Sequence, residues 1–542
     1  MQSTVDKLKQ VQLRIPTAIA IGLIVCIASG WLIGSASFST LKRITLMLLF
    51  LAYVLFWQGH TWKLGLAICL FGFSHIGFGF RIGVVELSAV AAFVLIAASF
   101  WRKRRMTRPV VMELVCFQVF NLTLLVWLLY SVGHAVYTIM DPFRPYDFAL
   151  KNFMKTIVAM TGPPLLVFYF MHQPRGIIAN SKMPGAVIWI GLTALVVNIV
   201  IRIWGMMHGA YNPDLVVDLD APGYFEIPGL DLVESPYILR SLTLFTATTS
   251  AVLLGSKWLE ARGPGFRALV YSLLGLSFIG AVMSGGRGAI IFAFVLAGAA
   301  LWMCRYYRTV LTAMGFGVLI FISLNLIPGV LRTVPPILQR SLQMIIFTDE
   351  SEFAAVDIAS SSSWRLELVR RSFDEWRSDP RVFWSGRGTY KFTHEDLIAR
   401  QRNRGEGDME ISLRRGTTHS LVTDLLVIYG LVGMIIYFAM MFSLLWFLWR
   451  VYKHPTTDEV ARMMTLACFL LLSFLFAYGI VGGASFPIDV AWLLIAVFGY
   501  LYGEANKRQV VRPKTALPAK TPLNPRRPLP ALPGSGRASA LH

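Results

Sequence analysis

The chain has 542 residues, of which 56% are hydrophobic and 15% are charged, well below the roughly 25% charged fraction of soluble domains. This composition excludes an ordinary soluble globular protein, because the apolar residues come in blocks of about 20, the length that crosses a bilayer. The formal net charge of +20 is typical of membrane proteins whose basic loops face anionic lipid, so membrane lipids are expected partners and nucleic acid is not.

Fourteen apolar blocks meet the length rule for a membrane span. They begin near residues 16, 41, 62, 82, 110, 153, 185, 236, 266, 287, 308, 419, 463 and 486. The pair over 62–80 and 82–100 is the weakest, because glycines, His75 and Arg81 interrupt it. The sequence predicts an all-α polytopic membrane protein with 12–14 transmembrane helices and a large external loop.

Lys and Arg in the short loops orient these spans, because cytoplasmic loops retain positive charge. The basic run at 101–108 is placed in the cytoplasm, and counting from it places the acidic segment 207–235 outside, as well as Arg81. The count divides the chain into 1–328 with transmembrane helices 1–11 and short loops, 329–418 as a large periplasmic or extracytoplasmic loop, 419–505 with transmembrane helices 12–14, and 506–542 as a disordered basic Pro-rich cytoplasmic tail.

The predicted extracytoplasmic loop is far longer than an ordinary loop, and its sequence indicates that it is folded. Four serines at 360–363 are candidate N-cap residues, and apolar residues after them recur at helical spacing until Asp379 and Pro380. We expect an amphipathic helix that starts at these serines and lies on the membrane surface or on other helices. Gly386 and Gly388 then predict a turn or a close backbone approach to a ligand.

Three ionisable residues lie at the predicted outer ends of spans. Arg202 is near the end of the seventh span, Arg287 begins the tenth, and His419 begins the twelfth. Charge near hydrocarbon is costly and tends to mark substrate or ion paths. Each residue alone is more typical of an interfacial Arg or a helix-end His, so the interpretation depends on all three lying at one predicted membrane depth.

Three motifs follow one another along the chain. SGGRG at 284–288 opens a span, SSSSWRLELVRRSFDEW at 360–376 is followed by GRG at 386–388, and THSLVTDLLVIYGLVGM at 418–434 opens the next span. This order, within about 185–445, resembles the O-antigen ligase and O-antigen (exopolysaccharide) polymerase family. The chain departs from the family pattern at Ser420, where Asn is usual, and at Ile428, where an acidic residue is common.

The resemblance implies a GT-C-like membrane glycosyltransferase with no cofactor and no metal. It implies a donor, an undecaprenyl diphosphate-linked glycan, and an acceptor, which is another glycan or the lipid A core. It further implies a multi-pass protein of the cell inner (plasma) membrane with its active site on the periplasmic side. A chain-length regulator and a flippase are implied as partners.

The resemblance also implies roles for individual residues. Catalytic roles fall to His419, as general base for the acceptor hydroxyl, and to Arg287, which neutralises the leaving diphosphate. The substrate-binding residues are Arg202, Arg365, Gly386 and Gly388.

Several alternatives stay open. The spacing of Arg377 and Gly388 matches an R-x10-G pattern described for polymerases, but a loop with this many Arg and Gly residues matches it easily. The long chain and its many spans favour a polymerase over a ligase. A transporter or flippase of lipid-linked glycans would also use arginines, although no internal repeat favours it. Asp218 and Asp220 have the D-x-D spacing of a divalent-cation site, but an acidic turn-rich loop surrounds them. The five cysteines support neither a disulfide framework nor a zinc site.

Overall fold

The structure is a computed structural model of the chain. It describes residues 73–77, 81–83, 115–140, 183–207, 225–227, 232–234, 236–284, 288–327, 329, 342, 346, 352–388, 409, 413, 420–453 and 459–481. These residues are mostly helical, as predicted for an all-α polytopic membrane protein. The helices are α5 (Val115–Met140), α7 (Met183–Met207), α9 (Pro236–Leu254), α10 (Lys257–Glu260), α11 (Pro264–Met283), α12 (Ala289–Met303), α13 (Tyr307–Leu326), α16 (Glu352–Ser378), α17 (Pro380–Ser385), α20 (Leu421–Lys453) and α21 (Glu459–Val481).

Five stretches of the described helices are long and apolar enough to cross a membrane, which confirms the prediction of a multi-pass membrane protein. They are Val115–His134, Pro264–Met283, Tyr307–Leu326, Leu421–Lys453 and Arg462–Ile480. Three shorter apolar helices, at Ile188–Val200, Leu242–Leu254 and Ala289–Met303, coincide with three further predicted spans. The predicted spans that begin near 16, 41, 153 and 486 lie outside the described residues, so the count of 12–14 stays a prediction.

A small antiparallel sheet accompanies the helices, with the strand order β2-β1-β4-β3. Its strands are β1 (Phe73–Gly77), β2 (Arg81–Gly83), β3 (Phe225–Ile227) and β4 (Leu232–Glu234). The predicted spans over 62–80 and 82–100, which glycines, His75 and Arg81 interrupt, are not helical at β1 and β2. Glycines at 72, 77 and 79 weaken a helix there by about 1 kcal/mol each relative to Ala. The pairing of β1 with β4 joins two segments that the charge count places on the same side of the membrane.

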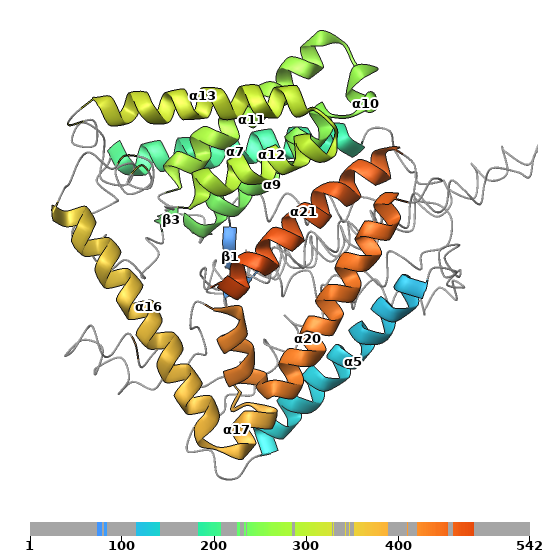
Figure 1. The fold of residues 1–542 in the computed structure, drawn as a ribbon, viewed down its shortest axis with the longest axis vertical. Helices are drawn as coiled ribbons and strands as arrows, with labels where there is room; N and C mark the ends of the chain where they lie inside the picture. The colour runs from blue at the N-terminus through green and yellow to red at the C-terminus, as the bar shows by residue number, and fades with distance from the viewer. Residues whose placement is uncertain are drawn as a thin grey trace, which may run out of the picture.

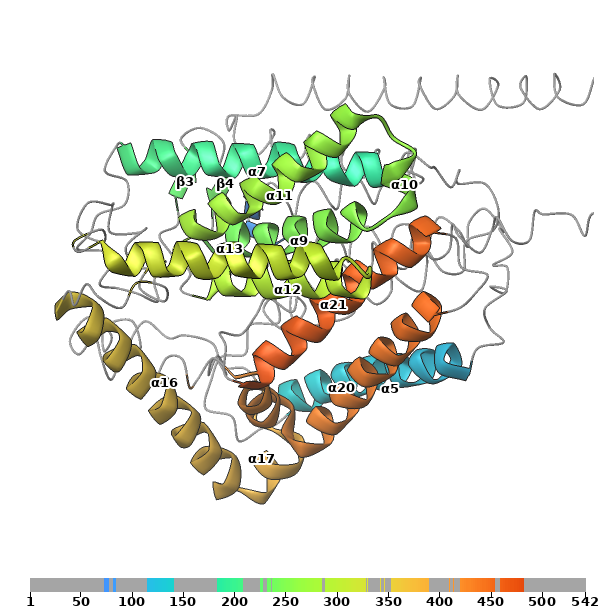
Figure 2. The same cartoon turned by 45° about the horizontal axis from the view of Figure 1, so that its top comes forward.

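The helices form two groups that α21 joins (Figure 1). One group contains α7, α9, α11, α12 and α13, and the other contains α5 and α20 with α16 and α17 along its edge (Figure 2). Helix α21 packs against α9 and α12 on one side and against α20 on the other. The ends of α12, α20 and α21 can therefore approach one another between the two groups.

Small and hydroxyl residues let α7, α9 and α11 pack closely. A Cβ on Gly280 of α11 would lie 2.7 Å from Thr243 Cγ2 and 3.0 Å from Leu195 Cδ1, so the three helices meet at this glycine. One turn away, the hydroxyls of Thr246 and Ser277 are 2.7 Å apart and share a hydrogen bond. Apolar side chains gain little by leaving lipid, so this close packing and hydrogen bonding hold the helices together.

Helix α20 packs against α5 in the second group. The ring of Phe447 lies between Phe117 and Phe120, with centroid distances of 5.4 and 6.0 Å. Nearby, the hydroxyls of Thr123 and Ser443 are 2.7 Å apart. This interface fixes the second half of α20, after residue 430, against α5.

The predicted helix of the 329–418 segment is present but starts earlier than expected. Helix α16 begins at Glu352, so the serines at 360–363 lie inside it and the prediction that they cap its start is wrong. Serine is tolerated inside a helix, since it costs less than about 0.7 kcal/mol relative to Ala. The predicted end at Asp379 and Pro380 is confirmed, because Asp379 caps the next helix, α17, by accepting a hydrogen bond from Arg381 N–H at 2.8 Å.

Candidate functional site

A bend in α20 lies at the centre of the candidate site. Gly430 has φ 68° and ψ −176°, which are not helical values, so the carbonyls of the turn before it lose their helical partners. Three groups from elsewhere replace those partners. Val427 O accepts from the Arg387 backbone N–H at 2.8 Å, Ile428 O accepts from the Gly388 N–H at 3.0 Å, and Tyr429 O accepts from the Tyr130 hydroxyl at 2.6 Å.

Gly386 makes this contact possible. Its φ of 71° and ψ of 170° fall in a region that essentially only glycine occupies. A Cβ on Gly386 would lie 2.3 Å from Ile428 O, so a larger residue would collide with the backbone of α20. The close approach at Gly386 is thus to the backbone of α20, whereas the sequence predicted a turn or an approach to a ligand. The predicted role of Gly386 and Gly388 in substrate binding stays a prediction.

The Arg387 side chain reaches two further segments. It is 6% exposed, and its Nη1 donates to Glu375 Oε1 of α16 in an ion pair. Its Nη2 donates to the backbone carbonyl of Leu413. Burial raises the pKa of the Glu375 carboxyl, and the nearby Arg387 guanidinium lowers it by less than burial raises it. The GRG segment therefore contacts α20 through its backbone and α16 and Leu413 through its side chain.

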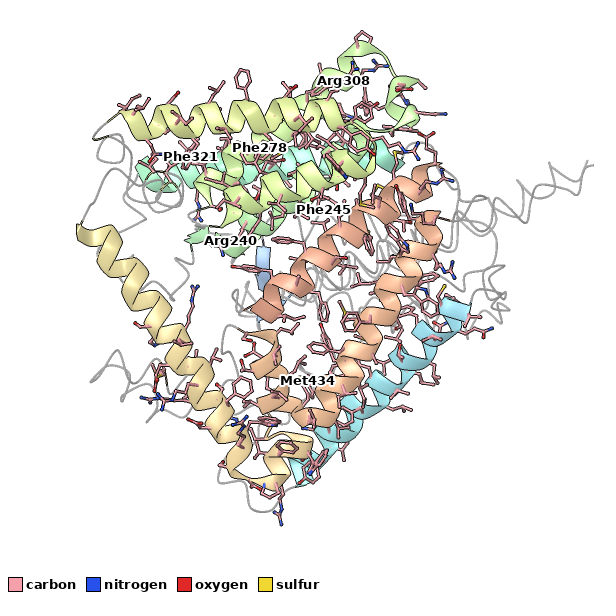
Figure 3. The ribbon with its side chains drawn as sticks, in the orientation of Figure 1. Arg240, Phe245, Phe278, Arg308, Phe321 and Met434 are labelled. Atoms are coloured by element: carbon pink, nitrogen blue, oxygen red, sulfur yellow. The ribbon has the colours of Figure 1, made fainter. Side chains whose placement is uncertain are left out.

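The last turns of α16 are packed onto the first half of α20. Trp376 Nε1 donates to Phe383 O of α17 at 3.0 Å, and the two rings stack with centroids 4.5 Å apart. Trp376 is buried in one cluster with Leu426 and Val427 of α20, and Met434, labelled in Figure 3, packs against that cluster. The substrate-binding candidate on α16, Arg365, is half-buried and lies ten residues before Glu375, about 15 Å along the helix.

Arg287 and His419, the two predicted catalytic residues, lie outside the described residues. The residues that follow them are described: Gly288 precedes the first residue of α12, and Ser420, 6% exposed, precedes the first residue of α20.

Both of these helix starts pack against the last turns of α21. Phe292, in the first turn of α12, contacts Phe474 and Tyr478 with centroid distances of 4.9 and 4.7 Å. Leu421, the first residue of α20, lies so close to Gly479 that a Cβ there would be 3.1 Å from Leu421 Cβ. The sequence motifs that contain Arg287 and His419 are therefore continued by helices that meet at the same end of α21.

The structure places Arg202 in the C-terminal part of α7, with its side chain 1% exposed. Arg240, labelled in Figure 3, is half-buried in the second turn of α9. Gly280 of α11 packs against both helices. Its neighbour on α7, Leu195, lies two turns before Arg202, and its neighbour on α9, Thr243, lies one turn after Arg240. Sequence analysis missed Arg240, although an arginine early in an apolar helix was the available signal. A substrate contact of Arg202 stays a prediction.

Three further residues of the site were missed: Tyr130, Glu375 and Arg387. In the sequence, Arg387 occupies the unspecified middle position of a G-x-G pattern. Glu375 is one of several charged residues in a predicted helix. Nothing in the sequence near Tyr130 distinguishes it from other interfacial tyrosines.

No group of three or more His, Cys, Asp or Glu residues that could hold a metal ion occurs among the described residues. The D-x-D pair, Asp218 and Asp220, lies outside them.

The fold and this arrangement define a multi-pass membrane protein with a bent helix that joins a folded segment to the helix bundle. The family model described as O-antigen ligase matches residues 272–438, from α11 to beyond the bend of α20. The match confirms the resemblance to the O-antigen ligase and polymerase family and shows a membrane glycan-processing function of that type, with lipid-linked glycan and an acceptor as general partners. No curated protein matches the chain. Of the predicted site residues, only Arg202 lies outside the matched range.

Proposed function

We propose that the protein is a metal-independent glycosyltransferase of the cell inner membrane. It transfers a glycan from an undecaprenyl diphosphate carrier to an acceptor sugar on the periplasmic side and so polymerises O-antigen or exopolysaccharide repeats. The observation that carries this proposal is that the starts of α12 and α20, which both lie inside the family-matched range, meet at the end of α21. These helices directly follow Arg287 and His419.

The chemistry of the reaction suits these residue types. The leaving group is a diphosphate, and an arginine guanidinium is a permanently charged planar fork that pairs with two of its oxygens. Arg287 and Arg202 neutralise the charge that develops there. Arg365 of α16 contacts the donor phosphate or glycan.

His419 removes the proton of the attacking hydroxyl. An imidazole with an ordinary pKa of about 6.5 is mostly deprotonated at neutral pH and is therefore a suitable general base. The hydroxyl oxygen attacks the anomeric carbon, the bond from that carbon to the diphosphate oxygen breaks, and the carrier leaves as its diphosphate.

The site's placement at helix ends also suits the substrate. The carrier's lipid tail remains in the membrane while its diphosphate lies at the surface, so a site formed by the starts of α12 and α20 receives both. In this proposal α16 and α17 lie on the periplasmic side of the site.

A purified-protein assay tests the proposal. The protein in detergent or liposomes is given carrier-linked glycan, and product length is read on a gel. We expect longer chains on the carrier. Arg287→Ala and His419→Ala are expected to abolish the transfer, while Arg308→Ala, which removes an exposed arginine from the start of α13, is expected to retain it (Figure 3). Unchanged glycan with folded wild-type protein would contradict the proposal, and activity in both site variants would contradict the site.

A second candidate is an O-antigen ligase, which the description of the matching family model favours. A ligase differs only in its acceptor, the lipid A core. The same assay with both acceptors present separates the two, because a ligase leaves the carrier-linked chains at their original length and moves them to the core. Loss of transfer in chelator, restored by magnesium or manganese, would instead support a metal site at Asp218 and Asp220.

A further inference from the structure

We propose that Arg387 is a positioning residue that holds Leu413, six residues before His419, at a fixed place relative to α16 and to the first half of α20. The proposal rests on the proposed function, in which His419 and Arg365 act on one substrate. In the described part of the structure Arg387 contacts neither His419 nor Arg365. It acts through its contacts with residues before and after His419 in the sequence.

The first observation is that Arg387 is a buried arginine among exposed ones. Its side chain is 6% exposed, whereas Arg370, Arg377 and Arg381 of the same region are exposed. Burying a guanidinium costs free energy unless its donors are paired. Both amino nitrogens of Arg387 have partners, so this guanidinium is held in a specific place rather than left in solvent.

The second observation is that Arg387 contacts the chain before and after His419. Its Nη2 donates to the carbonyl of Leu413, six residues before His419. Its backbone N–H donates to Val427 O, eight residues after His419, at 2.8 Å. One residue therefore fixes both ends of the segment 413–427.

The third observation is that the same guanidinium is tied to α16. Its Nη1 donates to Glu375, and the two amino nitrogens of the planar fork point to different partners at once. Glu375 is on the helix that presents Arg365. Arg387 thus joins Leu413, on the N-terminal side of the proposed general base, to the helix that carries the proposed donor-binding residue.

Such positioning affects the chemical step more than binding. A displacement of a reacting group by about 1 Å lowers a rate by about 100-fold. Removal of the Arg387 guanidinium releases residue 413 but leaves the backbone contacts with α20 intact. We therefore expect kcat to fall by about 10- to 100-fold while KM for the carrier-linked glycan stays within about twofold.

The decisive comparison is Arg387→Met, which keeps the apolar stem and removes every donor, with Arg370→Met, which makes the same change at an exposed position of α16. Glu375→Gln is the second comparison, because its amide oxygen still accepts and the Leu413 contact remains. We expect a loss of kcat in Arg387→Met only. Equal kcat in Arg387→Met and wild type, or an equal loss in Arg370→Met, overturns the proposal.

A readout independent of activity separates positioning from a general loss of stability. A nitroxide is attached to a cysteine at position 413 in a variant whose five native cysteines are replaced by serine. Arg387 binds the backbone carbonyl there, so the label leaves that contact in place. We expect the label to become more mobile in Arg387→Met than in Arg370→Met, and unchanged mobility contradicts the proposal.

If the Arg387→Met protein does not accumulate in the membrane, the Arg387→Lys variant tests the proposal instead. Lysine keeps the charge but donates from a single nitrogen, so it cannot hold both partners with the geometry of the fork. A fall in kcat of about tenfold with KM unchanged supports the proposal, and wild-type kcat contradicts it. Wild-type protein that transfers no glycan would instead refute the proposed function, while the nitroxide measurement still tests the positioning.

Discussion

Gly386 and Gly430 meet backbone to backbone, so that a Cβ added to either would lie 2.5 Å from the amide nitrogen of the other. Both have positive φ, 71° and 68°. The contact joins the end of α17 to the bend of α20, and it depends on the absence of a side chain at both positions.

Substitution of either glycine by alanine is expected to destabilise the protein. This backbone region costs a residue with a Cβ on the order of 1–3 kcal/mol, and the collision with backbone atoms adds to that. Gly386→Ala and Gly430→Ala should both lower the apparent Tm in detergent micelles. Gly275→Ala, in α11 with nothing within 4 Å of its Cβ position, is the control and should not lower it. An unchanged Tm in both site variants would contradict the described contact.

The Tyr130 hydroxyl is expected to stabilise the bend. Tyr130→Phe leaves Tyr429 O without this donor, and an unsatisfied buried acceptor costs about 1–3 kcal/mol. Thermal unfolding should show a lower Tm than for Tyr437→Phe, which removes the hydroxyl of a buried neighbouring tyrosine. Equal shifts in the two variants would mean that the hydrogen bond contributes nothing.

The amides of Arg387 and Gly388 are expected to exchange slowly with solvent deuterium. Both donate to carbonyls of α20, so they exchange only when the GRG segment leaves the bend. Hydrogen exchange of peptides that contain residues 386–388 measures this directly. Gly386→Ala should raise their exchange rate while peptides from α11 stay unchanged. Fast exchange in the wild type would show that the segment is not held.

Glu375 is expected to make stability depend on pH. Burial raises the pKa of its carboxyl above the ordinary 4.5, so the folded protein binds this proton more tightly than the unfolded chain does. The resulting stabilisation is present below 4.5 and is lost as pH rises through the raised pKa. As the pH falls from about 7 to about 4.5, the Tm of the wild type should therefore rise relative to that of Glu375→Gln. Parallel curves would contradict the direction of the shift.

The positions of the helices were predictable because length and apolar composition are local properties of the sequence. The predicted starts near 236, 266 and 308 lie within two residues of the observed ones. The bend at Gly430 was not predictable in the same way, because its hydrogen-bond donors, Tyr130 and the GRG segment, are far away in the sequence. A single glycine inside an apolar block does not show which distant groups will donate hydrogen bonds to the carbonyls that precede it.

The candidate site was predictable where a residue type indicates a backbone conformation, as glycine does at a positive φ. Gly386 was expected to form a turn or to approach a ligand, and in the structure it approaches the backbone of α20. Arg387 was missed because exposed and buried arginines look alike in a sequence, and burial is decided by the fold. The predicted start of α16 was wrong because serine is favoured at helix starts and is also tolerated inside helices. Propensity alone could not decide between a start at 352 and one at 360.

The bend in α20 has a consequence for how the protein is made. Its hydrogen-bond donors lie in α5 and in the GRG segment, both of which leave the ribosome before α20 does. A peptide with residues 421–453 alone has none of them, so we expect it to form a continuous helix through Gly430. The bend is then acquired during assembly, when the newly inserted helix docks onto segments that are already in place.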